Sequence, residues 1–171
     1  MERHDRALAV TCQYMGHRLL AMGKYAEALP EYRRAVELDA KLLLRDPRNQ
    51  GLIDEALAAE RGVTRALMFA GDRTGALKHA NQLVQRAEAG GGASSSAPIG
   101  EAYFTLAEVR RQFGDCDQAV QAAERSIHHL RSLITTGRHA SDRKVLDDAE
   151  ALLAECSSRT SPAAPARHHP F

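Results

Sequence analysis

A short pattern of small residues around a glycine occurs three times in this chain of 171 residues, and it strongly limits how the chain can fold. Its fullest copy reads Gly16-x2-Leu19-x3-Gly23-x-Tyr25-x2-Ala28-Leu29-x2-Tyr32-x2-Ala35-Val36, and shorter copies centre on Gly71-Asp72 and Gly114-Asp115. A glycine turn followed by an alanine–leucine step lets two antiparallel helices pack closely, so each copy predicts one helical hairpin. Repeated hairpins indicate a stacked helical array rather than one closed globule.

The composition fits an array of close-packed helices. Hydrophobic residues make up 44% of the chain but aromatic residues only 5%, and tryptophan is missing, so alanine and leucine must supply most of the core. These residues favour helices, whereas strands favour β-branched and aromatic residues. The net charge of +1 is too balanced to predict nucleic acid or an anionic membrane as a partner.

The sequence also favours a cytoplasmic protein. The charged start, residues 1–6, does not resemble a secretory signal, and no window approaches the roughly 20 apolar residues of a membrane-spanning helix. The chain has three cysteines, an odd number, and none of them forms a Cys-x-x-Cys spacing: Cys12, Cys116 and Cys156. A disulfide framework is therefore not expected, and a reducing compartment is the natural one.

Apolar periodicity and turn signals divide the chain into helices. Asp46-Pro47-Arg48-Asn49 predicts a break after the first hairpin, and Thr74 is a plausible N-cap in the second. We expect Gly16 and Ala28 to face each other in the first hairpin, and a mild bend at Pro30. The expected helices cover residues 6–22, 25–44, 52–69, 74–89, 99–113, 116–136 and 141–156.

The predicted fold is all-α: a right-handed α-solenoid of three helical hairpins plus a C-terminal capping helix. The helical repeat domain covers residues 1–156, with repeats at about 7–45, 51–89 and 99–136 and the capping helix at 141–156. Residues 90–98, rich in glycine and serine, predict a flexible linker, and residues 157–171 predict a disordered tail.

The segment 9–38 resembles a tetratricopeptide repeat. Gly16 and Gly23 match the family's two glycine positions, and Tyr25, Ala28 and Tyr32 match its second helix; Cys12 and Ala40 depart from the usual large residue and closing proline. The later copies are weaker, with Thr64 and Ala107 at the first glycine position. The bends lie 48 and 43 residues apart, longer than the family's period of about 34. Long repeats with an Asp-Pro-x-Asn break are similar to C-terminal extensions of some bacterial Ser/Thr protein kinases.

In tetratricopeptide arrays the first helices of the repeats line a concave groove that takes a peptide or a helix of a partner. Arg61 and Arg65 are four residues apart and point together, so with Arg111 they could favour an acidic partner, although solvated surface arginines are the more ordinary interpretation. The groove that the resemblance implies consists of Gln13, His17, Leu20, Arg61, Arg65, Met68, Phe69, Phe104, Glu108 and Arg111.

No motif for catalysis, a metal or a cofactor occurs. His128 and His129 are adjacent on a helix and point about 100° apart, so they cannot ligate one ion together. His168 and His169 lie in the predicted tail, and the cysteines fit helical packing positions. The predicted function is therefore a non-enzymatic protein-interaction module. The alternative is a self-associating regulatory module, or a detached sensor or scaffold segment of a bacterial signalling protein such as a Ser/Thr kinase; the oligomeric state stays open.

Overall fold

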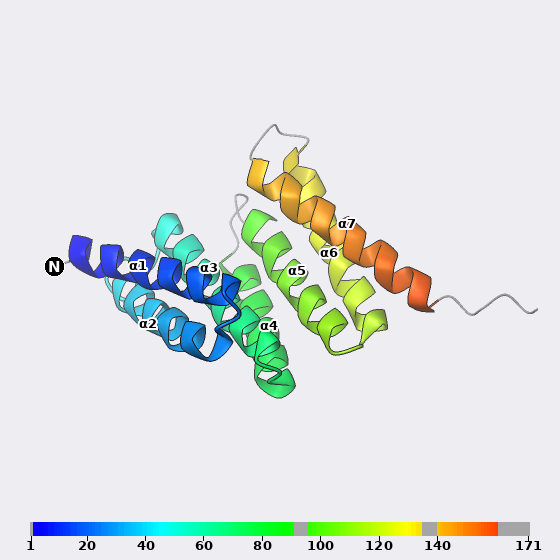
Figure 1. The fold of residues 1–171 in the computed structure, drawn as a ribbon. Coiled ribbons are helices and arrows are strands. Elements are labelled where there is room, and N and C mark those ends of the chain that lie inside the picture. Colours follow the sequence, from blue (N-terminus) through cyan, green and yellow to red (C-terminus); the bar gives the residue numbers. More distant parts are fainter. Residues whose placement is uncertain (1, 91–95, 135–139, 161–171) are drawn as a thin grey trace, which may run out of the picture.

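The computed structural model describes residues 2–90, 96–134 and 140–160, and within these ranges every element is an α-helix. Figure 1 shows the helices following one another in chain order from one end of the molecule to the other. The prediction of an all-α array is confirmed. The helices are α1 (Glu2–Ala21), α2 (Tyr25–Leu43), α3 (Gln50–Phe69), α4 (Arg73–Ala89), α5 (Ser96–Gln112), α6 (Cys116–Ile134) and α7 (Ala140–Thr160).

The three hairpin bends have the same backbone geometry. Gly23, Gly71 and Gly114 have φ angles of 73°, 81° and 81°, a left-handed conformation that glycine adopts without strain. At the first bend, Gly23 N donates to Leu20 O at 3.0 Å and Lys24 N donates to Leu19 O at 2.9 Å. The other two bends repeat this pair of hydrogen bonds, which is the Schellman arrangement. The glycines therefore close the first helix of each hairpin.

The aspartate that follows the glycine in the second and third bends starts the next helix. Asp72 Oδ1 accepts a hydrogen bond from Gly75 N at 2.8 Å, and Asp115 Oδ1 accepts one from Gln118 N at 3.4 Å. Asp72, rather than Thr74 as the sequence suggests, is thus the N-cap of α4. A Gly-Asp pair ends one helix and begins the next within two residues.

The boundaries between hairpins differ partly from the predicted ones. Asn49 caps α3 by accepting from Leu52 N at 3.2 Å, so the break at 46–49 lies where the sequence predicts it. Helix α5 already begins at Ser96, because Pro98 is tolerated in a first turn, so 96–98 are helical and not linker. Helix α7 likewise continues to Thr160, four residues into the predicted tail. Residues 91–95, Gly137 and 161–171 lie outside the described residues.

Small residues allow the close helix packing. Helix α2 runs through Pro30 without a break, and its buried side packs on α1 and α3. Each helix contacts the next one in the chain, and α1 also contacts α3, α3 contacts α5, and α5 contacts α7. Within the described ranges no such contacts join α2 to α4 or α4 to α6. The first helices therefore lie closer together than the second helices. Alanines with no exposed surface include Ala28, Ala35, Ala59, Ala66, Ala76, Ala80, Ala107, Ala119, Ala123 and Ala149.

Candidate protein-interaction surface

The first helices α1, α3 and α5 form one continuous surface, which we call the inner face. Because these helices contact one another while the second helices do not, the array curves toward this side. The residues for which the sequence predicts a groove all belong to these three helices. The side chains of the inner face come from three separate hairpins, so their relative positions depend on how the hairpins pack.

Arginine–glutamate pairs join α1 to α3, α3 to α5, and α5 to the capping helix α7. Arg6 of α1 contacts Glu55 of α3 at 2.6 Å, and Arg65 of α3 contacts Glu108 of α5 at 2.7 Å. In every pair the arginine belongs to the earlier helix and the glutamate to the later one. Two further pairs follow the same order, Arg61 with Glu101 between α3 and α5, and Arg111 with Glu155 at 3.4 Å between α5 and α7. We call these four contacts the inner-face ion pairs.

The most enclosed of these pairs has the strongest electrostatic consequences. Burial lowers the pKa of Arg61 and raises the pKa of Glu101, while the charge of each partner opposes the shift in the other. About a quarter of each side chain remains exposed, 24% for Arg61 and 22% for Glu101. The two charged groups therefore interact mainly with each other rather than with solvent.

A buried carboxyl lies behind the first ion pair. Asp39 of α2 has no exposed surface, and its Oδ1 atom has no hydrogen-bond partner. Gln13 Nε2 lies 3.4 Å from Asp39 Oδ2 and donates to Glu55 O at 3.2 Å. Burial, followed by the charge of Glu55, raises the pKa of Asp39 to about 6. Gln13 is thus turned inward between α1, α2 and α3.

A tyrosine ring lies beneath the inner face, between two glycines. Tyr32 of α2 is fully buried, and a Cβ atom added to Gly16 of α1 would lie 2.9 Å from its ring. A Cβ atom on Gly62 of α3 would overlap the same ring. His17 covers the ring from outside, edge to face at a centroid distance of 5.4 Å. The side chain nearest to a Cβ atom added at Gly16 is thus that of Tyr32, whereas the sequence led us to expect Ala28.

The fold of this chain is similar to that of solved structures. No protein-family model matches the sequence, and no curated protein matches it. The tetratricopeptide-repeat domain of Arabidopsis FLU is 21% identical, with a TM-score of 0.59, and the match covers 77% of this chain and 99% of that one. The chain has a tetratricopeptide-repeat fold. A tetratricopeptide-like protein from Chlorobium tepidum TLS is 16% identical with a TM-score of 0.62, covering 92% of this chain and 99% of that one.

Within this tetratricopeptide array, the predicted groove residues have different environments. Met68 and Phe104 are only 3% and 7% exposed and belong to the core, so they are not open for contact with a partner. Phe69, at the end of α3, is 42% exposed, and its ring stacks on that of Tyr25 at a centroid distance of 5.2 Å. Leu20, near the end of α1, is partly buried. His17 is exposed. The remaining predicted residues, Gln13, Arg61, Arg65, Glu108 and Arg111, contact other parts of the array.

Several residues that shape this surface are not evident from the sequence. Gly62 was not recognised as the second glycine around Tyr32, although a glycine in the middle of a predicted helix is a signal for a close approach. The glutamates that pair with the arginines are ordinary in the sequence, since pairs 40 or more residues apart leave no local pattern. Only the stacking of hairpins brings them together.

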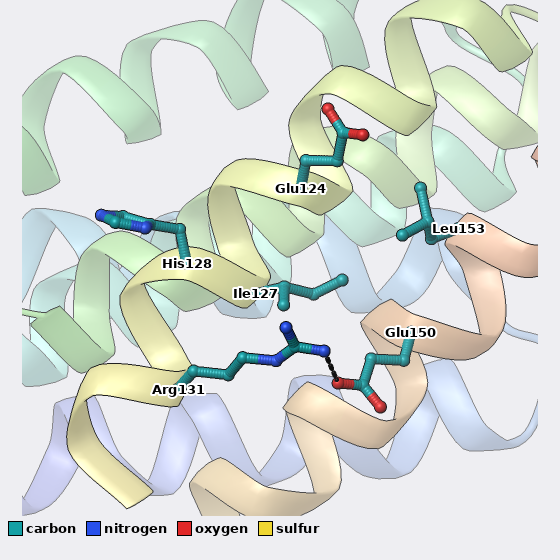
Figure 2. Close-up of a pocket in the computed structure, with 6 residues that line it drawn as sticks. All are labelled: Glu124, Ile127, His128, Arg131, Glu150 and Leu153. Carbon is teal, nitrogen blue, oxygen red and sulfur yellow. Dashed lines mark hydrogen bonds and ion pairs between the residues drawn. The ribbon is translucent and has the colours of Figure 1, made fainter. Parts of the chain in front are cut away.

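Two open pockets lie away from the inner face. One, of about 330 Å³, lies between α6 and α7 and is lined by Glu124, Ile127, His128, Arg131, Glu150 and Leu153 (Figure 2). Figure 2 shows Arg131 reaching Glu150, at 2.8 Å, while the His128 ring extends away from this pair. Glu150 therefore pairs with Arg131 rather than with His128. A smaller pocket of about 170 Å³ lies between α2, α3 and α4, near the Arg86–Glu60 ion pair.

The described part of the chain contains no group of three or more metal-ligating side chains. The rings of His128 and His129 meet edge to face at 80°, and His129 stacks on Tyr103 at 6.1 Å. His168 and His169 lie outside the described residues. Among the described helices, none is long and apolar enough to cross a membrane.

Proposed function

We propose that this protein is a non-catalytic interaction module that binds a peptide segment or a helix of a partner protein on its inner face. The observation that carries the proposal is the continuous surface of α1, α3 and α5, fixed by the inner-face ion pairs. Repeat arrays use such extended inner surfaces for recognition. Near the bends that close α1 and α3, a partner could contact a histidine, an aliphatic side chain and an aromatic ring, those of His17, Leu20 and Phe69.

The ion pairs change the expected chemistry of the partner. Arg61, Arg65 and Arg111 each face a glutamate, so the reason for predicting an acidic partner is removed. A partner segment gains more from apolar contact with Leu20 and Phe69, with neutral hydrogen bonds fixing its register, because burial of apolar surface is the dominant favourable term in most protein–protein association. We place the module in the cytoplasm, where cysteines that form no disulfide remain reduced.

The test is affinity capture from a lysate of the native organism with matched variants. His17→Glu combined with Phe69→Asp alters exposed positions of the inner face without breaking an ion pair. Leu44→Asp is the control, because Leu44 is 84% exposed at the end of α2. We expect a partner that binds the wild type and the control but is lost at least tenfold from the double variant, which corresponds to roughly 1.4 kcal/mol or more. A partner retained by all three proteins would place the binding site elsewhere.

Self-association is a second candidate, because α1 exposes several large apolar side chains. Val10, Tyr14 and Met15 are 36%, 71% and 49% exposed, and Met22 just beyond the helix is 65% exposed. A second copy covering this side would make the chain a self-associating regulatory module, or a sensor or scaffold segment of a bacterial signalling protein such as a Ser/Thr kinase. Sedimentation should then give a mass that rises with concentration, and Tyr14→Lys should abolish the rise. A constant monomer mass would remove this candidate.

A further inference from the structure

Side chains at equivalent positions meet where consecutive units join at the bend edge of the array. Tyr25, the first residue of α2, stacks on Phe69 at the end of α3, with ring centroids 5.2 Å apart. Arg73, the first residue of α4, lies 5.9 Å from the ring centroid of Phe113, just after α5. In both cases the residue that opens a second helix contacts the end of the following first helix. We call these the joint contacts.

The third joint contact consists of two thiols. Cys116 is the first residue of α6, and Cys156 lies in the last part of α7. Cys156 belongs to the core cluster shared by α5, α6 and α7, and Cys116 packs against this cluster, near enough to Cys156 to raise its pKa. Figure 1 shows α6 and α7 running beside each other toward the end of the array. The geometry of the array therefore places two sulfur atoms at the position occupied by an aromatic stack in the first joint.

The two thiols differ in their access to solvent. Cys156 is fully buried, whereas Cys116 is partly exposed. Burial, followed by the neighbouring Cys116 thiol, raises the pKa of Cys156 to about 11, so this thiol is protonated at physiological pH. Cys12 in α1 is buried in a different cluster, which leaves it out of reach of the other two. An accessible thiol next to a buried one is the arrangement of an attacking and a resolving cysteine.

We propose that Cys116 and Cys156 form an oxidation site that closes to a disulfide in the presence of a small peroxide and fixes α7 to α6. The Cys116 thiolate attacks one oxygen of hydrogen peroxide, so an S–O bond forms, the O–O bond breaks, and the released hydroxide takes up a proton. The Cys156 sulfur then attacks the Cys116 sulfur, the S–O bond breaks, and the Cys156 proton leaves with that hydroxide as water. Two thiols and one peroxide give one disulfide and two waters, a two-electron oxidation.

The disulfide would strengthen the last joint of the array. Without it, α7 is held by the shared core and by exposed ion pairs such as Arg131–Glu150. A cross-link between Cys116 and Cys156 closes a long loop that contains the connection to α7, and long closed loops restrict the unfolded chain most. This inference does not depend on what the inner face binds.

The experiment treats the full-length reduced protein with hydrogen peroxide and maps its peptides by mass spectrometry without reduction. We expect a Cys116–Cys156 cross-linked peptide that dithiothreitol reverses, in the wild type and in Cys12→Ser. The cross-link should be lost in Cys156→Ser. Amide hydrogen exchange in α7 should slow by roughly tenfold or more on oxidation, because local opening of α7 is restricted.

Several outcomes would overturn the proposal. Oxidation of Cys116 to a sulfinic acid without a cross-link would show that Cys156 does not resolve the sulfenic acid. Cross-links that involve Cys12 or join two chains would place the reactive pair elsewhere. A Cys116–Cys156 disulfide that leaves exchange in α7 unchanged would refute the fixing of that helix. The wild-type peptide map gives the result even if a variant fails to fold.

Discussion

Tyr32 lies where α1, α2 and α3 meet, and its ring fits there because two neighbouring residues are glycines without a side chain. Gly16 and Gly62 leave room for the ring from either side, and the phenol oxygen is buried without a hydrogen-bond partner. Burial raises the pKa of Tyr32 to about 12, so the phenol stays neutral at physiological pH. The ring thus joins the first hairpin to the second through shape rather than polar contact.

Gly62→Ala should destabilise the protein by about 1–3 kcal/mol, because the new methyl group would overlap the Tyr32 ring. Urea denaturation gives the change in the free energy of unfolding. The matched control is Gly51→Ala in the first turn of the same helix, where an added Cβ meets only side-chain atoms at 3.4 Å or more. This control should be neutral or stabilising by up to about 1 kcal/mol. If Gly62→Ala costs as much in a Tyr32→Leu background, the overlap with the ring is not the cause.

Asp39 gives a second residue-scale prediction, a dependence of stability on pH. Its carboxyl has an ordinary pKa of 3.8 and a folded-state pKa of about 6. Between these values the folded protein holds a proton that the unfolded chain has released, so the contribution of Asp39 to stability falls as pH rises. Asp39→Asn should therefore exceed the wild type by about 2–3 kcal/mol near pH 8, and this advantage should disappear below about pH 4.

The measurement for Asp39 is the free energy of unfolding in urea across this pH range. Asp147→Asn serves as the control, because Asp147 is exposed on α7 and far along the chain from the first hairpin. A difference between Asp39→Asn and the wild type that stays constant with pH would mean that the carboxyl is not the titrating group.

At the scale of helices, the inner-face ion pairs join α1 to α3, α3 to α5, and α5 to α7. All four place arginine on the earlier helix and glutamate on the later one, so each pair favours one sliding position of one helix against the next. Partly exposed pairs contribute little to stability individually. Their effect is to fix register, while the alanine-rich core supplies most of the favourable energy.

Arg65→Glu should cost about 1–2 kcal/mol, because it places two carboxylates together between α3 and α5. Adding Glu108→Arg should recover most of this loss by restoring an opposite pair. The recovery, measured by urea denaturation, should shrink at high salt because ions screen the pair. The same reversal at Arg131 and Glu150, whose side chains are 66% and 43% exposed, should have a smaller effect. Additive costs at positions 65 and 108 would mean that the two residues do not interact.

At the scale of the whole molecule, the array is built from contacts between neighbouring units. Helix α7 covers the end of the third hairpin with Leu146, Ala149 and Leu152, which are buried against α5 and α6. This agrees with the need of a helical array for a terminal unit that covers its last apolar face. The likeness to kinase extensions stays a prediction of the sequence.

The sequence by itself determined the helices and their bends. Gly23, Gly71 and Gly114 act locally, through a left-handed backbone conformation and hydrogen bonds within five residues, so their positions predict where helices end. The alternation of apolar and polar residues predicted the core sides of the helices in the same local way. Even so, α5 and α7 extend beyond their predicted limits, because the local signals at helix ends are weak.

Only the tertiary structure decided which residues remain open on the inner face. The pairs Arg65–Glu108 and Arg111–Glu155, the fit of Tyr32 against Gly62, and the thiol pair all join residues 30 or more positions apart. Met68 and Phe104 likewise became core residues through the stacking of hairpins. Local sequence fixes backbone dihedral angles and helical faces, but the relative position of two helices depends on the shapes and charges of side chains that no local pattern connects.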